Sequence, residues 1–168
     1  FSFILIDNKN KKIHLIRDLA GEKPLYMYFD NNLIMFSSDL SAIKKLPSFH
    51  KEINKESIQY YLEYNYIPNP HTIFKNVFKL PASTFLTIDF KKFKYQAFKD
   101  FNSIINNEAI SFENWWVLNL NKKENKKMSF HEAEELVYEN LKSSVKKQLI
   151  SDVPLGAFLS AGIDSSLI

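Results

Sequence analysis

A polar segment divides this chain in two. Residues 121–127, with the sequence NKKENKK, contain no apolar side chain, so they cannot lie in a hydrophobic core. Apolar residues are frequent on both sides, and the composition changes sharply at this point. We therefore predict one domain over residues 1–121, a linker over residues 122–128, and a second domain that begins at residue 129.

The first part has the pattern of a β-rich domain. Short apolar segments alternate with turn residues over the first forty positions, which is typical of an antiparallel meander. The expected strands are FSFILID (1–7), IHLI (13–16), PLYMYF (24–29) and LIMFSS (33–38). Further along, we expect a strand pair over residues 76–90, broken at Pro81, and a weak strand over residues 90–98.

Two helices are expected between these strands. Ser38 or Asp39 is the predicted N-cap of a short helix that ends before Pro47. Asn54 is the predicted N-cap of a second helix, and Pro68 and Pro70 lie beyond its end. An apolar stripe on that helix consists of Ile58, Tyr61 and Leu62. Residues 99–121 show no clear period, and we expect Trp115 and Trp116 to anchor the chain there.

The second part begins with the clearest helix signal. Ser129 and Glu132 fit a capping box, and apolar residues then recur at helical spacing as far as Leu149. Pro154 ends the helix, and PLGAFL (154–159) reads as a short buried parallel strand. A loop of small residues and the start of another helix follow. This order of elements predicts the opening of an α/β domain with a parallel sheet.

The loop has the composition of an anion-binding site. Main-chain N–H groups and hydroxyls at a strand-to-helix turn can bind phosphate, and Gly162 allows close approach. Asp164 is suited to Mg²⁺, which would bridge to phosphate oxygens. The candidate residues are Ser160, Gly162, Asp164, Ser165 and Ser166. Taken alone, the loop fits an ordinary turn with Asp164 or Ser165 as the helix N-cap better than it fits a phosphate site.

Other kinds of site fit the sequence poorly. No lysine follows Gly162 as a Walker A loop requires, and Phe158 stands where a nucleophile elbow has glycine. The chain has no cysteine, and its 4 histidines show no metal-ligand spacing. A net charge of +3, with lysines spread along the chain, favours a solvated surface over a nucleic-acid groove. No apolar run approaches the roughly 20 residues that span a bilayer.

Several segments together resemble one enzyme family. FLSAGIDSS is similar to the SGGxDS pyrophosphate loop of N-type ATP pyrophosphatases, and residues 149–168 resemble the start of the synthetase domain of glutamine-dependent asparagine synthetases. Upstream, residues 17–46 and 61–88 are similar to that family's Arg-Asp, Gly-x-x-Pro-Leu-Tyr, Pro-x-x-Thr-Ile-Phe and Lys-Leu-Pro segments. The resemblance covers nearly the whole chain and is weakest over residues 97–127.

The resemblance implies a fold class for each part. Residues 1–121 would be the later part of an α+β glutaminase domain of the N-terminal-nucleophile type, built on antiparallel sheets. Residues 129–168 would begin an α/β synthetase domain of the adenine-nucleotide alpha-hydrolase-like (PP-loop) type. Both ends would then be cuts through a longer protein, with the glutaminase cysteine upstream and the acceptor pocket downstream, so we expect the 168-residue chain alone to be inactive.

The resemblance also implies the chemistry. Such enzymes use glutamine, aspartate and ATP, with Mg²⁺, and form asparagine through β-aspartyl-AMP. We expect a cytoplasmic protein with no nucleic-acid or membrane partner, and a homodimer is left open. Within the chain, the matching positions would bind ATP and pyrophosphate through Ser160, Gly162, Ser165 and Ser166, bind Mg²⁺ through Asp164, and contact the adenosine through the backbone of Leu159. No catalytic residue is expected here.

Some positions depart from the family pattern or allow a different interpretation. Ala161 replaces the usual first glycine of the loop, and Asp39 replaces a usual glutamate. Arg17 and Asp18 match a family pair, but we expect them to form an ion pair that fixes a turn. Three alternatives stay open: an amidotransferase for another carboxylate, such as a sugar acid or peptide; an ATP pyrophosphatase with unrelated chemistry, such as tRNA thiolation; and a non-catalytic truncated remnant.

Overall fold

The chain forms two compact units. The computed structural model describes residues 1–119 and 128–168, and it divides into Phe1–Asn119 and Leu120–Ile168, each described by itself below. Most of the predicted linker over residues 122–128 lies outside the described residues.

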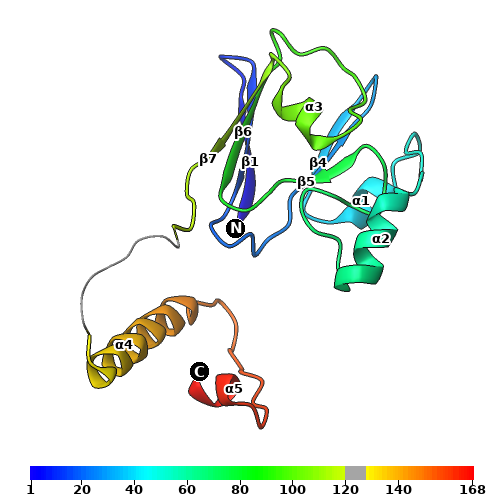
Figure 1. Cartoon of the computed structure of the whole chain (residues 1–168). Coiled ribbons are helices and arrows are strands. Elements are labelled where there is room, and N and C mark those ends of the chain that lie inside the picture. Colours follow the sequence, from blue (N-terminus) through cyan, green and yellow to red (C-terminus); the bar gives the residue numbers. More distant parts are fainter. Residues whose placement is uncertain (120–127) are drawn as a thin grey trace. The chain divides into compact units, whose positions relative to one another are not determined.

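Two antiparallel sheets make up most of the first unit (Figure 1). One sheet has the order β1-β2-β6-β7 and the other has the order β4-β3-β5. The strands are β1 (Ser2–Asp7), β2 (Lys12–Arg17), β3 (Tyr26–Phe29), β4 (Ile34–Ser37), β5 (Val77–Lys79), β6 (Thr84–Asp89) and β7 (Ile110–Asn114). The four strands predicted near the start all form.

The expected single meander is wrong, because the chain changes sheets after β2. β2 pairs with β6, where Leu15 lies opposite Leu86, and β3 pairs with β5, where Met27 lies opposite Phe78. The turn between β2 and β3 carries the chain from one sheet to the other. Pairing with β6 and β5 places Leu15 of β2 and Met27 of β3 in one shared core, which lies between the two sheets.

A single hydrophobic cluster joins the two sheets. Leu15 of β2, Leu86 of β6 and Phe29 of β3 are all completely buried in it. The same cluster contains further residues of both sheets, one residue of a short helix and one of the loop after β5: Met27, Phe78, Ile88, Ile110, Ile104 and Leu80. Alternate residues of β6 thus face this core, as the period of a half-buried strand requires.

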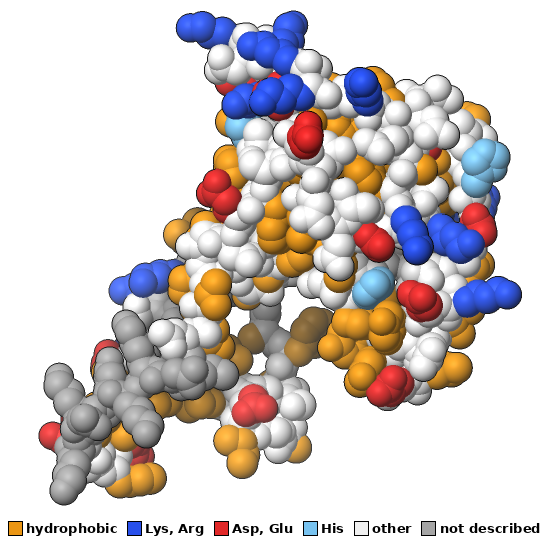
Figure 2. Space-filling model, turned by 45° about the horizontal axis from the view of Figure 1, so that its top comes forward, with side chains coloured by type: hydrophobic (Ala, Val, Ile, Leu, Met, Phe, Trp, Pro, Cys, Tyr) orange, Lys and Arg blue, Asp and Glu red, His pale blue; other side chains and the backbone are white. Residues whose placement is uncertain are grey.

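The two predicted helices are present at the edge of this unit. Helix α1 (Leu40–Lys44) begins after Asp39, whose carboxylate accepts a hydrogen bond from the Ser41 N–H over 2.8 Å. Helix α2 (Lys55–Tyr64) begins after Asn54 as predicted. The stripe on α2 faces solvent, since Leu62 is 76% exposed, and the only buried residue of this helix is Ser57. Hydrophobic side chains therefore also reach the surface of the first unit, as Figure 2 shows.

The stretch from residue 90 to residue 114 differs from the prediction. Residues 90–98 form no strand; they are a loop from which Phe93 and Phe98 enter the core, and the Phe98 ring packs edge-on against Phe29 with centroids 5.1 Å apart. Core packing therefore accounts for the apolar pattern that suggested a strand. Helix α3 (Phe101–Ile105) and strand β7 follow in the stretch where no period was visible.

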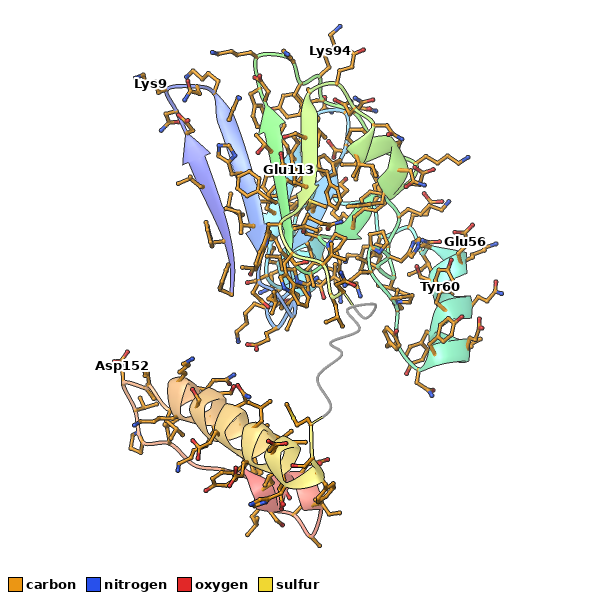
Figure 3. The ribbon with its side chains drawn as sticks, turned by 60° about the vertical axis from the view of Figure 1, so that its left-hand side comes forward. Lys9, Glu56, Tyr60, Lys94, Glu113 and Asp152 are labelled. Carbon is orange, nitrogen blue, oxygen red and sulfur yellow. The ribbon has the colours of Figure 1, made fainter. Side chains whose placement is uncertain are left out.

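The described part of the second unit contains two helices. Helix α4 (Phe130–Gln148) begins after Ser129 with the predicted capping box to Glu132, and helix α5 spans Ile163–Leu167. Figure 3 labels Asp152 in the segment that leads away from α4. Residues 154–159 are not a strand, in contrast to the prediction, because residues 128–168 contain no neighbouring strand to pair with. Among residues 1–119 and 128–168, no helix is long and apolar enough to cross a membrane.

Candidate functional site

The candidate loop connects an extended segment to α5. Gly162 is the N-cap of this helix, with φ −81° and ψ 152°, and no side chain caps the first turn. The alternative in which Asp164 or Ser165 is the N-cap is therefore wrong, because both residues already lie within the helix. Gly162 instead allows the chain to turn close to its neighbours, since a Cβ there would lie 3.3 Å from Ser160 Oγ.

Hydroxyl groups hold this loop together. Ser160 Oγ and Ser165 Oγ lie 2.8 Å apart, and the Ser160 N–H donates to Ser165 Oγ over 3.2 Å. The Gly162 N–H donates to Ser160 Oγ over 3.3 Å, and Ser166 Oγ donates to the Gly162 carbonyl oxygen over 2.9 Å. The structure therefore brings together the four residues for which phosphate binding is expected.

Asp164 and Leu159 are placed differently from these four. The Asp164 carboxylate is exposed and makes no hydrogen bond or ion pair with the described part of the chain, and Leu159 is 78% exposed. No group of three or more possible metal ligands occurs among residues 1–119 and 128–168. A lone carboxylate suits Mg²⁺ that is otherwise held by water and phosphate oxygens, which is how proteins usually bind this ion.

Ala161 fits the loop without backbone strain. It is absent from the described non-glycine residues that have a positive φ, which are Lys11, Asn65, Asn76 and Ser83. An alanine methyl group is tolerated wherever φ is negative. A shallow depression of about 390 Å³ lies over the loop and is lined by Ala161, Gly162, Ile163, Ser166 and Leu167.

A larger hollow lies in the first unit, away from any residue predicted to bind a ligand. It measures about 1040 Å³ and is lined by the start of α2 and by residues between His71 and Phe78. Lys75 and Glu52 form an ion pair beside it. Its lining combines both signs of charge with apolar groups and indicates no particular chemistry.

Arg17 and Asp18 do fix the turn after β2, but not through the predicted ion pair. Arg17 donates to the carbonyl oxygens of Lys23, Gly21 and Leu80, over 2.9 Å and 2.7 Å for the first two. The Asp18 carboxylate accepts from the N–H groups of Ala20, Glu22 and Lys23 over 3.0, 3.0 and 3.3 Å. Both charges therefore bind main-chain groups of this turn, and Arg17 also binds the buried carbonyl oxygen of Leu80.

The charge of Asp18 is well stabilised. Although burial opposes ionisation, hydrogen bonds from the main-chain N–H groups of Glu22 and Lys23 hold the pKa of Asp18 below its usual value. A carboxylate that accepts several N–H bonds behaves in this way. Asp18 is therefore a structural anion in the first unit.

Ser83 and Trp115 complete this region, and the sequence singled out only the tryptophan. The Trp115 main-chain N–H donates to the Ser83 carbonyl oxygen over 3.0 Å, and Ser83 Oγ donates to the Trp116 carbonyl oxygen over 2.6 Å. Ser83 has a positive φ of 50°. Trp115 anchors the end of β7 as expected, mainly through its polar groups, since 47% of the residue remains exposed.

Two family models match this chain in sequence order. The glutamine amidotransferase domain model matches residues 1–99, and the asparagine synthase model matches residues 136–168. The first match covers more than half of the chain.

Individual relatives match over the whole chain. A protein of Methanocaldococcus jannaschii that is named as a glutamine-hydrolysing asparagine synthetase is 34% identical over 175 residues, which cover 100% of this chain and 30% of the relative. Asparagine synthetase 1 of Bacillus subtilis is 28% identical over 170 residues, covering 100% of this chain and 23% of the relative. The chain thus spans less than a third of the length of these relatives.

Proposed function

Since the chain belongs to the family of glutamine-hydrolysing asparagine synthetases, we propose that it is part of a longer enzyme that makes asparagine from aspartate, glutamine and ATP. Two family models in the family's own domain order support this, and so does similarity to named synthetases along the entire chain. The observation that carries the proposal is the loop of residues 160–166, in which four expected phosphate-binding residues come together.

In this proposal the loop binds the polyphosphate of ATP. Ser160, Gly162, Ser165 and Ser166 surround the β- and γ-phosphates, and the backbone of Leu159 faces the adenosine. The exposed Asp164 carboxylate would hold Mg²⁺, for which it fits as a single protein ligand beside phosphate oxygens. The ion would supply positive charge to the phosphates.

The proposed reaction has two steps. A carboxylate oxygen of aspartate attacks the α-phosphorus of ATP, which gives β-aspartyl-AMP and releases pyrophosphate. Ammonia from glutamine then attacks the activated carbonyl carbon and displaces AMP, so that asparagine forms and glutamate remains. Donors from the loop stabilise the negative charge that grows on the departing pyrophosphate.

The first unit would be the later part of the glutaminase domain, with the N-terminal-nucleophile type of fold, over residues 1–121. Its antiparallel sheets and buried core would act as a scaffold, with the glutamine-hydrolysing cysteine elsewhere in the protein, since this chain contains none. Residues 122–128 would be the linker and residue 129 would begin the synthetase domain with the PP-loop type of fold.

The partners in this proposal are small molecules. Glutamine, aspartate and ATP would be the substrates, and the cytoplasm, where ATP is plentiful, would be the site of action. The expectation of a homodimer comes from the family resemblance alone. Sedimentation of the full-length protein would measure its oligomeric state directly.

ATP–pyrophosphate exchange in the full-length protein tests this proposal. We expect labelled pyrophosphate to enter ATP at a rate that rises with added aspartate. Exchange stimulated by a sugar acid or a peptide carboxylate instead would identify an amidotransferase with another acceptor. Absence of exchange with every carboxylate would indicate a non-catalytic remnant and would overturn the proposal.

A further inference from the structure

Two turns at one end of the first unit carry a cluster of lysines. The turn between β1 and β2 lies beside the loop that follows β6, because β2 pairs with β6 and the Phe90 N–H donates to the Lys11 carbonyl oxygen over 2.9 Å. Figure 3 labels one lysine of each segment, Lys9 and Lys94, at this end of the unit. Folding thus joins two distant parts of the sequence into one surface, which we call the lysine patch: Lys9, Lys11, Lys12, Lys91, Lys92 and Lys94.

The ammonium groups of the lysine patch are available to a ligand. None of them makes a hydrogen bond or an ion pair with residues 1–119 or 128–168. Lys12 is half-buried and the other five residues are exposed. Figure 2 shows Lys and Arg side chains gathered at the top of the first unit.

The net charge of the first unit is concentrated at this end. Asp7, Asp89 and Glu108 lie on the same strand ends, since the Asp89 N–H donates to the carbonyl oxygen of Ala109 over 2.8 Å. Six lysines against these three carboxylates leave an excess of three positive charges. The whole of residues 1–119 contains 15 Lys and Arg against 12 Asp and Glu, which is the same excess of three. The rest of the first unit is therefore electrically balanced.

The acidic side chains at this end are partly used by the turns themselves. Asp7 accepts hydrogen bonds from the main-chain and side-chain nitrogens of Asn10 over 2.9 and 2.7 Å. Asp89 accepts from the main-chain N–H of Lys91 over 2.9 Å. Both carboxylates thus stabilise the turns that present the lysines.

An exposed aromatic ring lies beside the lysine patch. Phe93, which follows two of the lysines, is buried in the core cluster and fixes this loop to the first unit. The rings of Phe93 and Tyr95 lie edge to face with centroids 6.0 Å apart, yet Tyr95 remains 50% exposed. The core therefore holds the Tyr95 ring in a defined position at the surface.

We infer that the lysine patch and Tyr95 bind single-stranded nucleic acid. Ammonium groups neutralise backbone phosphates, and an exposed aromatic ring offers a face on which a base can stack. An acidic protein segment fits less well, because lysine is depleted at protein interfaces and carboxylates do not stack on a tyrosine ring. The sequence suggested a solvated surface because its lysines are spread along the chain, whereas the fold gathers six of them.

The first test measures how binding depends on salt. Fluorescence anisotropy follows a labelled oligouridylate of about 20 nucleotides as full-length protein is added, at about 50 to 200 mM KCl. If six phosphates are neutralised, the logarithm of the association constant should fall against the logarithm of salt concentration with a slope of about −4. The triple variant Lys91→Gln, Lys92→Gln and Lys94→Gln should bring the slope to about −2 and weaken binding about tenfold or more at the lowest salt.

A matched triple variant controls for the change in net charge. Lys44→Gln, Lys45→Gln and Lys51→Gln remove three exposed lysines of the same unit, at and after α1, which lies away from the turn between β1 and β2 in Figure 1. We expect this variant to keep the wild-type slope. Equal effects of the two triple variants, or a wild-type protein that does not bind, would overturn the inference.

The second test removes the aromatic ring. Tyr95→Leu keeps an apolar contact with Phe93 but offers no face for stacking, so we expect affinity to fall about 5- to 100-fold at every salt concentration with an unchanged slope. Tyr95→Phe should bind like wild type. Tyr61→Leu, on the exposed stripe of α2, is the control and should have no effect. Normal binding by Tyr95→Leu would contradict the role of this ring.

Other polyanions decide between classes of partner. The same protein is titrated with a glutamate-rich peptide and with vesicles that contain phosphatidylserine. Tighter binding to either than to oligouridylate would assign the lysine patch to an acidic protein or to a membrane and would overturn the inference.

This inference stands apart from the proposed function. The lysine patch and Tyr95 belong to the first unit and contain none of the residues expected to bind ATP. Asparagine formation by the lysine and Tyr95 variants should therefore equal that of wild type. A wild-type protein that forms no asparagine would contradict the proposed function and leave the binding result unaffected.

Discussion

The indole Nε1–H of Trp115 donates to the main-chain oxygen of Arg17 over 3.3 Å, although 98 positions separate the two residues in the sequence. The Trp115 main-chain N–H also binds the Ser83 carbonyl oxygen, and the Ser83 N–H binds the carbonyl oxygen of Asp18 over 2.8 Å. The end of β7 is thereby tied to the end of β2. Arg17 and Asp18 lie at the centre of this region. Substitutions there should therefore change the stability of the first unit.

Replacing Arg17 by lysine should destabilise the first unit strongly. A single ammonium group cannot reach the three carbonyl oxygens that the guanidinium binds, so one buried acceptor, of Leu80, and two partly buried acceptors lose bonds. We expect the free energy of unfolding, measured with urea, to fall by about 2–4 kcal/mol. Lys9→Ala, in the exposed turn labelled in Figure 3, is the control and should stay within about 0.5 kcal/mol. Equal effects of the two changes would contradict the role of Arg17.

Two glycines allow a matched comparison of the same substitution. Gly21 has φ +67°, and a Cβ there would lie 3.0 Å from Ala82 Cβ and 3.1 Å from Arg17 Cζ. Gly156 has no neighbour within 4 Å of such a Cβ and no positive φ. We expect Gly21→Ala to lower the melting temperature, at a cost of about 1–3 kcal/mol, and Gly156→Ala to leave it nearly unchanged. If both variants changed the melting temperature by a similar amount, a side chain at position 21 would not strain the turn after β2.

Asp18 should make the stability of the first unit depend on acid pH. Because hydrogen bonds hold its pKa low in the folded state, its ionisation stabilises the fold above the unfolded-state pKa of about 3.9. This stabilisation is lost as the pH falls from there through the folded-state pKa. Urea unfolding at a series of pH values below 5 should show a smaller loss in Asp18→Asn than in wild type. Parallel curves for the two proteins would rule out this contribution.

Asp164→Asn should abolish most of the activity of the full-length enzyme and leave its fold intact. The carboxylate has no partner in the described part of the chain, so its removal costs little stability, whereas the proposed Mg²⁺ site loses its charge. We expect turnover to fall by about 100-fold or more, with an unchanged melting temperature. Glu113→Gln, on the exposed side of β7, is the control for a carboxylate-to-amide change. Near-normal turnover of Asp164→Asn would remove this residue from the mechanism.

Local signals in the sequence were sufficient for most elements. The caps of α1, α2 and α4 are set by Asp39, Asn54 and Ser129 within one turn of each helix, and the first strands alternate clearly with turns. Strand pairing was not predictable in this way. Leu15 pairs with Leu86 because both sheets share one core. The local sequence around either residue does not indicate which strand it pairs with. Helix α3 is too short to show a period, and Phe98 is a buried residue of a largely exposed loop.

The sequence suggests the candidate residues but does not give their geometry. The order of Ser160, Gly162, Asp164 and Ser165 is enough to suggest phosphate chemistry. Only the structure shows that the Ser165 hydroxyl points inward while Asp164 stays exposed. The same limit applies to Arg17 and Asp18, whose adjacent opposite charges suggest an ion pair although both bind main-chain groups.

The products formed by the full-length protein test the central claim most directly. It is incubated with ATP, Mg²⁺, aspartate and glutamine that carries ¹⁵N in its side-chain amide, and the products are separated by mass. The account predicts asparagine with ¹⁵N in its amide, formed in equal amounts with AMP and pyrophosphate. ADP and phosphate as the nucleotide products, or no labelled asparagine, would contradict it.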